Sequence, residues 1–161
     1  MNIFKKLLVG TAAVVSSVLV LTGCTSYFSY SYNLDTGDSV EVKLDTSNGL
    51  KLKNADNGFK VLSKDGEELV EGSFDTYEKM QGQGEYIAEA EAAGAEGLND
   101  VYSNTDDLLY YSYDENGTTI LQQLIKVSDK TCVIYYSEAD KDDAEEAFDA
   151  LTVGLAGEDD D

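Results

Sequence analysis

Apolar and polar residues alternate along much of the chain, and this pattern predicts a domain rich in β-strands. Over residues 28–34, aromatic or aliphatic side chains occupy every second position. A period of two residues is typical of a strand that buries one face. The alternative interpretation is an aromatic segment lying at a membrane surface, where tyrosine is enriched.

Two hairpins are predicted further along the chain. Residues 40–44 and 50–52 alternate on either side of an Asn-Gly turn, which favours a hairpin with one solvent-exposed face. Residues 59–62 and 68–70 flank an Asp-Gly dipeptide, which is typical of tight hairpin turns.

The middle of the chain favours helix. Ser73 is a suitable N-cap for a short helix that ends at Gly82 and Gly84. Residues 85–93 are rich in alanine and glutamate, which favour helix, although their alanines also alternate as in a strand. We expect helix here.

The clearest pattern is a three-stranded antiparallel meander over residues 108–113, 118–127 and 131–136, joined by polar turns. Residues 137–140 open an amphipathic helix. Its apolar stripe has helical spacing and consists of Ala144, Ala147, Phe148 and Leu151. Because several strands are apolar on both faces, we expect this helix to cover one face and residues 74–98 the other.

These elements predict an α+β fold, an antiparallel sheet with hairpins and a C-terminal amphipathic helix. Their order, best defined over residues 131–151, resembles the α/β/α sandwich of PsbP-like domains. The resemblance is one of topology alone. It implies a scaffold or adaptor rather than an enzyme, although a fold does not fix a function.

The N-terminus has the layout of an export signal. Lys5 and Lys6 precede an apolar run over residues 7–21. This run is shorter than the roughly 20 apolar residues that span a bilayer as a permanent helix. It ends in Leu21-Thr22-Gly23-Cys24, which resembles the lipobox of bacterial lipoproteins.

The lipobox resemblance implies that Cys24 carries a diacylglycerol and that signal peptidase II cuts between Gly23 and Cys24. Two or three acyl chains hold a protein stably in a membrane, whereas one chain binds reversibly. We therefore expect a protein anchored by lipid to the bacterial cell membrane and facing the extracytoplasmic side. The expected parts are a signal peptide (1–23), a lipidated N-terminus that is a tether or first strand (24–37), one α+β domain (38–156) and an acidic disordered tail (157–161).

Charge and composition exclude several classes of function. The chain has 32 Asp and Glu residues against 11 basic residues, all of them lysine, and its formal charge is −21. Removal of the leader takes away Lys5 and Lys6 and no acid, which lowers this −21 to −23. Nucleic acid is excluded as a partner because its binders need many cationic contacts to phosphate. The chain also lacks histidine, the usual general base and imidazole ligand.

The tyrosines indicate that the chain folds despite this charge. High net charge with few large aliphatic residues is typical of disorder. All 11 tyrosines lie after Cys24, however, and their rings supply apolar surface for a core.

Neither a cofactor nor a metal is expected. Cys132 is the last free thiol once Cys24 is lipidated, so no disulfide forms within the chain, and we expect a buried, inert cysteine. The best fit to a calcium loop has Gly117 at its sixth position and lacks two carboxylates; its other key positions are Ser112, Asp114, Asn116 and Gln123. Asn116-Gly117 is equally a hairpin turn.

One candidate ligand platform consists of five tyrosines, Tyr110, Tyr111, Tyr113, Tyr135 and Tyr136. On one exposed sheet face they would stack on sugar rings or a partner peptide, and otherwise they fill the core. We expect a non-enzymatic module that binds or scaffolds another envelope component, a protein or glycan, through its sheet face. The alternative is a surface lipoprotein that binds a glycan or small ligand through these tyrosines; a hydrolase ranks last.

Overall fold

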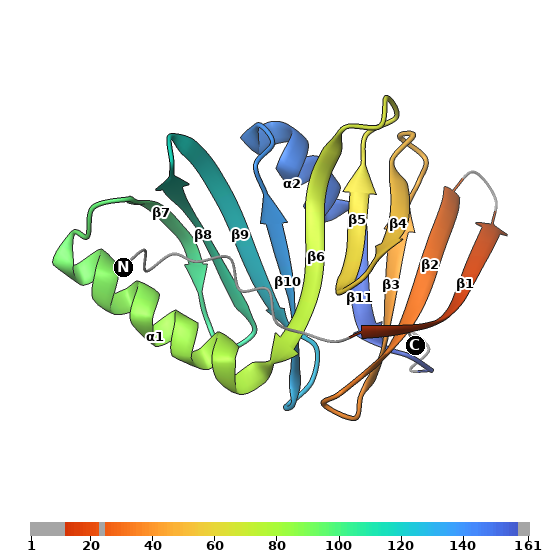
Figure 1. The fold of residues 1–161 in the computed structure, drawn as a ribbon, viewed down its shortest axis with the longest axis horizontal. Helices are drawn as coiled ribbons and strands as arrows, with labels where there is room; N and C mark the ends of the chain where they lie inside the picture. The colour runs from red at the N-terminus through yellow and green to blue at the C-terminus, as the bar shows by residue number, and fades with distance from the viewer. Residues whose placement is uncertain (1–11, 23–24, 158–161) are drawn as a thin grey trace.

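The computed structural model describes residues 12–22 and 25–157, which form two antiparallel sheets and two helices (Figure 1). The smaller sheet has the strand order β1-β2-β3-β11. Its strands are β1 (Ala12–Thr22), β2 (Thr25–Leu34), β3 (Ser39–Asp45) and β11 (Leu151–Leu155).

The larger sheet has the strand order β4-β5-β6-β10-β9-β8-β7. Its strands are β4 (Lys51–Ala55), β5 (Gly58–Leu62), β6 (Glu68–Thr76), β7 (Leu98–Asn104), β8 (Leu108–Glu115), β9 (Thr118–Lys126) and β10 (Thr131–Ser137). β6 and β10 pair at its centre, with Val133 opposite Phe74. Segments from the two halves of the chain therefore meet in the middle of this sheet.

One hydrophobic core lies between the two sheets and under α2 (Lys141–Asp149). Tyr32 of β2 is fully buried there, with its ring centroid 5.1 Å from that of Phe74. The Tyr32 hydroxyl donates a hydrogen bond to the carbonyl of Gly58 at 3.2 Å. Phe148 of α2 stacks on Tyr135 of β10 at 5.5 Å. Aromatic side chains thus join the smaller sheet and α2 to one face of the larger sheet.

A second core lies on the other face of the larger sheet, under α1 (Tyr77–Ala93). Figure 1 shows α1 starting at the end of β6 and running along the side of the sheet where β7 and β8 lie. Met80 and Ile87 are its largest buried aliphatic residues, and they pack with Leu109, Ile134 and their neighbours. Both faces of the larger sheet are covered, which explains why its strands are apolar on both sides.

Several predicted elements are confirmed. The hairpin around Asp65-Gly66 is formed by β5 and β6. The meander is formed by β8, β9 and β10. Residues 28–34 belong to strand β2, the strand alternative for this segment. A helix covers each face of the larger sheet, and the mixed α+β class holds.

The predicted hairpin of residues 40–44 and 50–52 is wrong. The first segment is β3, which pairs with β2 and β11, and the second is β4, which pairs with β5 in the other sheet. The Ser47-Asn48-Gly49 turn therefore carries the chain between sheets. Leu44 and Leu50 are both buried in the core that the two sheets share.

The predicted short helix capped by Ser73 is also wrong. Ser73 continues strand β6, and the N-cap is Thr76, whose side-chain oxygen accepts a hydrogen bond from the Lys79 amide at 3.4 Å. Pairing of β6 with β10 holds residues 73–76 extended, so the helix begins only at Tyr77. It then continues through Gly82 and Gly84 to Ala93. The helix predicted over residues 85–93 is part of α1.

The amphipathic helix forms as α2 but is not the last element of the domain. Ala144, Ala147 and Phe148 are buried as its stripe predicts, whereas Leu151 begins strand β11. Strand β7 was not predicted either. Residues 1–11, 23–24 and the predicted tail 158–161 lie outside the described residues.

Candidate functional site

The predicted lipid attachment residue, Cys24, and the preceding Gly23 lie outside the described residues. On either side of them, Thr22 is opposite Thr25, at the end of the β1–β2 ladder. The predicted cleavage between Gly23 and Cys24 would therefore separate two strands that are paired in the uncut chain. Among the described residues, neither helix is long and apolar enough to cross a membrane.

The five predicted platform tyrosines do not share an exposed face, so the structure corrects that prediction. Tyr111, Tyr113 and Tyr135 are at most 1% exposed, Tyr136 is 9% exposed and Tyr110 is half-buried. Tyr111, Tyr113 and Tyr136 belong to the core under α1, whereas Tyr135 belongs to the opposite core. The chain has few other large apolar residues, and it fills both cores with tyrosine.

The hydroxyls of Tyr110 and Tyr111 have hydrogen-bond partners inside the fold. The Tyr111 hydroxyl donates to Oε1 of Gln122 at 3.0 Å and accepts from Nε2 of Gln83 at 3.1 Å. The Tyr110 hydroxyl donates to Oε1 of Glu145 at 2.8 Å. Burial raises the pKa of Tyr110 and Tyr111, and the Glu145 carboxylate adds to the rise at Tyr110. These phenols stay protonated donors at physiological pH.

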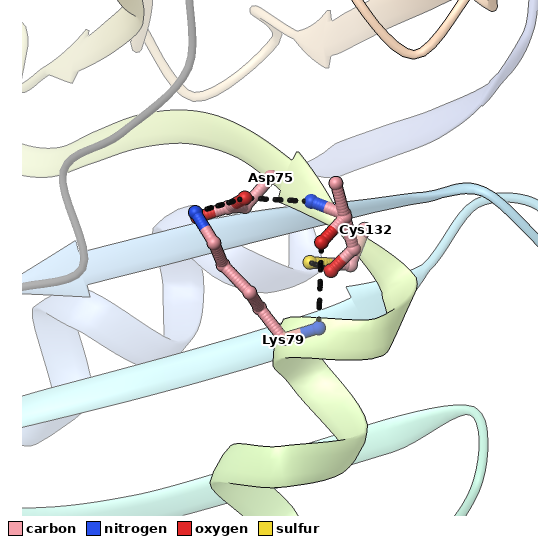
Figure 2. Close-up of polar contacts among 4 residues, drawn as sticks. Asp75, Lys79 and Cys132 are labelled. Carbon is pink, nitrogen blue, oxygen red and sulfur yellow. Dashed lines mark hydrogen bonds and ion pairs between the residues drawn. The ribbon is translucent and has the colours of Figure 1, made fainter.

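Cys132 is buried, as predicted, and lies beside an ion pair (Figure 2). It is opposite Asp75 of β6, and its Sγ donates to the Thr76 carbonyl at 3.5 Å. Burial, with a smaller contribution from the Asp75 carboxylate, raises the pKa of Cys132 to about 12. A nucleophilic cysteine needs the thiolate form. This thiol therefore does not act as a nucleophile at neutral pH.

The Asp75 side chain is almost fully buried where β6 ends and α1 begins. Nζ of Lys79 lies 2.9 Å from its Oδ1 and 3.0 Å from its Oδ2 (Figure 2). The Thr76 amide donates to the same Oδ1 at 2.7 Å. A buried carboxylate is costly unless it is paired, and here its oxygens are occupied. The cluster of Asp75, Lys79 and Cys132 is thus a structural joint between β6, β10 and α1.

The candidate calcium loop is a hairpin turn with its polar groups engaged. Asn116 and Gly117 have φ of 53° and 83°, the left-handed values that a tight β8–β9 turn needs. Asp114 Oδ1 accepts from Asn99 and Thr119 at 2.8 Å each, and these bonds lower the pKa of that carboxyl. No group of three or more potential metal ligands occurs among the described residues.

Sequence reasoning missed an exposed tyrosine beside the predicted ones. Tyr102 of β7 is 39% exposed, and its ring centroid lies 4.5 Å from that of Tyr110. Nζ of Lys141, at the start of α2, lies 4.2 Å from the Tyr102 ring centroid. A cleft of about 480 Å³ adjoins them, lined also by Ser112, Thr118 and Asp140 among others. Residues 98–104 alternate only weakly between apolar and polar side chains, and they contain too few apolar residues to predict a strand.

Comparisons of the chain with known protein families, with curated proteins and with solved structures find no match. Any proposal about function therefore rests on the residues and their geometry.

Proposed function

We propose that this chain is a lipid-anchored, extracytoplasmic protein of the bacterial cell envelope that works as a non-enzymatic binding or scaffold domain. The observation that carries the proposal is the leader, with Lys5 and Lys6, the apolar run over residues 7–21 and the lipobox that ends at Cys24. Charge, run length, a small residue and a cysteine follow one another in the order that export and lipidation require.

The chemistry of the domain supports a non-enzymatic role. The chain contains no histidine, and the buried Cys132 thiol has a pKa of about 12. One enzymatic chemistry that needs neither group uses a pair of carboxylates, one of which is desolvated so that its pKa rises. Asp75, which is deeply buried, has its carboxylate occupied by Lys79 and by the Thr76 amide at the start of α1.

The high negative charge is consistent with an anchored domain that is repelled by the membrane surface beside it. A charge of −23 is repelled by anionic lipid headgroups and by other acidic surfaces within the Debye length of about 8 Å. It keeps the domain solvated next to the membrane. We therefore place recognition of an envelope protein on the uncharged parts of the sheets rather than on the acidic surface.

The proposal includes kinship with PsbP-like domains, on topology alone. What supports it is a central antiparallel sheet with α1 on one face and α2 on the other. The smaller sheet of β2, β3 and β11 is an addition to that plan. Kinship of this kind implies a scaffold or adaptor rather than a catalyst.

The test compares the two cysteines of the chain. Cells that express the full chain are fed an alkyne-tagged fatty acid, and membranes are separated from soluble protein. We expect Cys24→Ser to abolish fatty-acid labelling and to leave the leader uncut, as intact-mass spectrometry would show. Cys132→Ser serves as the matched control, and it should be labelled, cut at Gly23 and recovered with membranes. Full labelling and membrane recovery of Cys24→Ser would refute the proposal.

A second candidate function is binding of a saccharide or similar polar ligand in the cleft beside Tyr102. The observation in its favour is an exposed aromatic ring next to hydroxyl groups and the Lys141 amine. Calorimetric titration with soluble cell-wall glycan fragments tests it. Binding should be lost in Tyr102→Ala and retained in Tyr27→Ala, which removes the other largely exposed tyrosine. No heat of binding with any fragment would exclude this function.

A further inference from the structure

The leader strand β1 covers one edge of the domain. It pairs antiparallel with β2 from Ala12 opposite Leu34 to Thr22 opposite Thr25. Figure 1 shows β1 as the outermost strand of the smaller sheet, beside β2. The proposed cut between Gly23 and Cys24 would remove β1 and make β2 the edge of the sheet.

Strand β2 is held in the domain without β1. It pairs with β3 from Tyr27 opposite Asp45 to Asn33 opposite Ser39. Tyr32 adds its buried ring and its hydrogen bond to Gly58 of the other sheet. Loss of the leader therefore exposes the edge of an ordered strand.

The groups that the cut exposes can be identified from the ladder. The Leu34 amide and carbonyl both bond within the β2–β3 turn, and the Ser26 carbonyl accepts from Thr46 after β3. Backbone groups of alternate residues point to opposite edges of a strand. The amides and carbonyls of the odd-numbered residues, including Tyr27, Ser29 and Asn33, therefore point to the edge that β1 covers.

This edge lacks the features that prevent strands from pairing. Soluble proteins protect edges with charged residues, prolines, bulges or short strands. Residues 25–34 contain no charge and no proline, in a chain with a formal charge of −21. β2 also pairs with β3 without a register shift. The opposite edge of the sheet, β11, has only five residues.

We propose that, in the processed protein, the freed edge of β2 pairs antiparallel with β2 of a second copy of this chain, with Ser29 opposite Ser29. This inference rests on the proposed removal of the leader. A two-fold axis perpendicular to the sheet keeps each face on the same side in both copies. The odd-numbered residues 25–33 then lie opposite one another, and Ser29 is at their centre.

A second copy suits this edge better than another partner. β1 shows that the edge accepts a long antiparallel strand, and β2 offers a strand of matching length. Three charged residues of adjacent β3 lie opposite the odd-numbered residues of β2. Glu41 and Lys43 form an ion pair at 3.3 Å, and Asp45 lies at one end, opposite Tyr27. Lipid anchors confine all copies to one surface, which raises their effective concentration. The pair would run along the membrane surface, with a Cys24 at each end.

Disulfide trapping in membranes from cells that express the full chain tests the proposal. Residues in a hydrogen-bonded antiparallel pair have Cα atoms about 5.5 Å apart, which a disulfide spans. Ser29→Cys should give a covalent dimer under mild oxidation. Ser31→Cys, on the same face, should give about tenfold less, because four residues along a strand separate its Cα atoms by about 13 Å. Co-expressed Tyr27→Cys and Ser31→Cys chains should link to each other.

The outcomes separate this inference from the proposed function. Intact-mass spectrometry of the same samples shows whether the leader has been cut and Cys24 lipidated. An uncut, unlipidated chain would refute both proposals. A cut and lipidated chain without the Ser29→Cys and the mixed cross-link would refute the dimer alone. Equal cross-linking of Ser29→Cys and Ser31→Cys would also refute it, since random collision would explain both. In the Cys24→Ser background β1 stays on the edge, and the Ser29→Cys cross-link should be lost.

Discussion

Asp38 Oδ2 accepts a hydrogen bond from the Thr131 hydroxyl at 2.6 Å, and this bond joins the two sheets at one end of the domain. Asp38 lies in the β2–β3 turn and Thr131 begins β10. Ser128 Oγ donates to the same carboxylate oxygen at 2.5 Å, and the Thr36 and Thr131 hydroxyls are 2.7 Å apart. These hydrogen bonds fix one turn of the smaller sheet against a turn of the larger one.

Because Asp38 accepts these hydrogen bonds as a carboxylate, we expect the free energy of unfolding to depend on pH. Hydrogen bonds from Ser128 and Thr131 lower the pKa of Asp38 in the folded state below its usual 3.8. The ionised Asp38 carboxylate therefore contributes its full stabilisation at pH values above the pKa that Asp38 has in the unfolded chain. This stabilisation is lost as the pH falls through the lower pKa of Asp38 in the folded protein. Asp38→Asn should reduce the free energy of unfolding by about 1 kcal/mol at pH 7. Urea titrations from pH 7 to pH 2 should show this difference shrinking.

The control for Asp38→Asn is Asp65→Asn, which removes one acidic charge in the exposed β5–β6 turn. It should leave the free energy of unfolding nearly unchanged at pH 7. A difference between wild type and Asp38→Asn that stays constant down to pH 2 would contradict the assignment to the ionised carboxylate.

Gly72 makes room for the Phe59 ring in the core. A Cβ at Gly72 would lie 2.1 Å from Phe59 Cζ, far inside van der Waals contact. Gly72→Ala should therefore lower the free energy of unfolding by about 3 kcal/mol or more, as overpacked cores do. Gly82→Ala is the matched control, since a Cβ there meets nothing within 4 Å. It should raise stability by about 0.5–1 kcal/mol, because alanine favours helix over glycine. Thermal unfolding should show a lower midpoint for Gly72→Ala and a higher midpoint for Gly82→Ala than for the wild type.

Because Lys79 pairs with the buried Asp75, its substitution should lower the free energy of unfolding more than substitution of a partly exposed lysine usually does. Lys79→Met leaves the buried Asp75 carboxylate without this cation and should cost about 1–2 kcal/mol of unfolding free energy. Lys53→Met removes an exposed lysine on β4 and should change stability by less than about 0.5 kcal/mol. Equal stabilities of the two variants in urea would show that the ion pair contributes nothing.

Cys132 should resist thiol reagents in the folded protein. With a pKa of about 12, its thiolate fraction at pH 8 is about a thousandfold below that of an ordinary cysteine. In the Cys24→Ser chain Cys132 is the only cysteine, so reaction with a chromogenic disulfide reports on it alone. We expect negligible reaction until urea unfolds the protein, and then complete reaction. Rapid modification of the folded chain would show that the thiol is accessible.

The elements that sequence predicted correctly are those fixed by neighbouring residues. The β5–β6 hairpin and the β8–β9–β10 meander have turns whose residue types favour reversal, and their strands pair with the next strand along the chain. The α2 stripe was equally local, and three of its four residues are buried in the helix.

The errors arose where distant residues decide. Ser47-Asn48-Gly49 has the composition of a hairpin turn, yet β3 pairs with β2 and β11 instead of β4. Ser73 is a good cap by residue type, but pairing with Ile134 of β10 keeps it in a strand. Neither pairing can be predicted from the residues next to it in the sequence.

The candidate site shows the same limit. That Cys132 is buried could be predicted from an apolar strand without charged neighbours. The tyrosines could not be assigned to a surface or a core until the positions of α1, α2 and the smaller sheet were known. Tyr102, the exposed one, lies in a strand with too little alternation to be recognised.

Strand β11 sets the time at which the domain can finish folding. Leu151 pairs with Leu44, so the smaller sheet, which contains β1 to β3, is completed by β11, which lies more than 100 residues further along the chain. Pairing between residues so far apart in sequence is slow, and a chain emerging from the ribosome cannot complete it early. A protein that must pass unfolded through a narrow export channel, as the proposed leader requires, benefits from this delay.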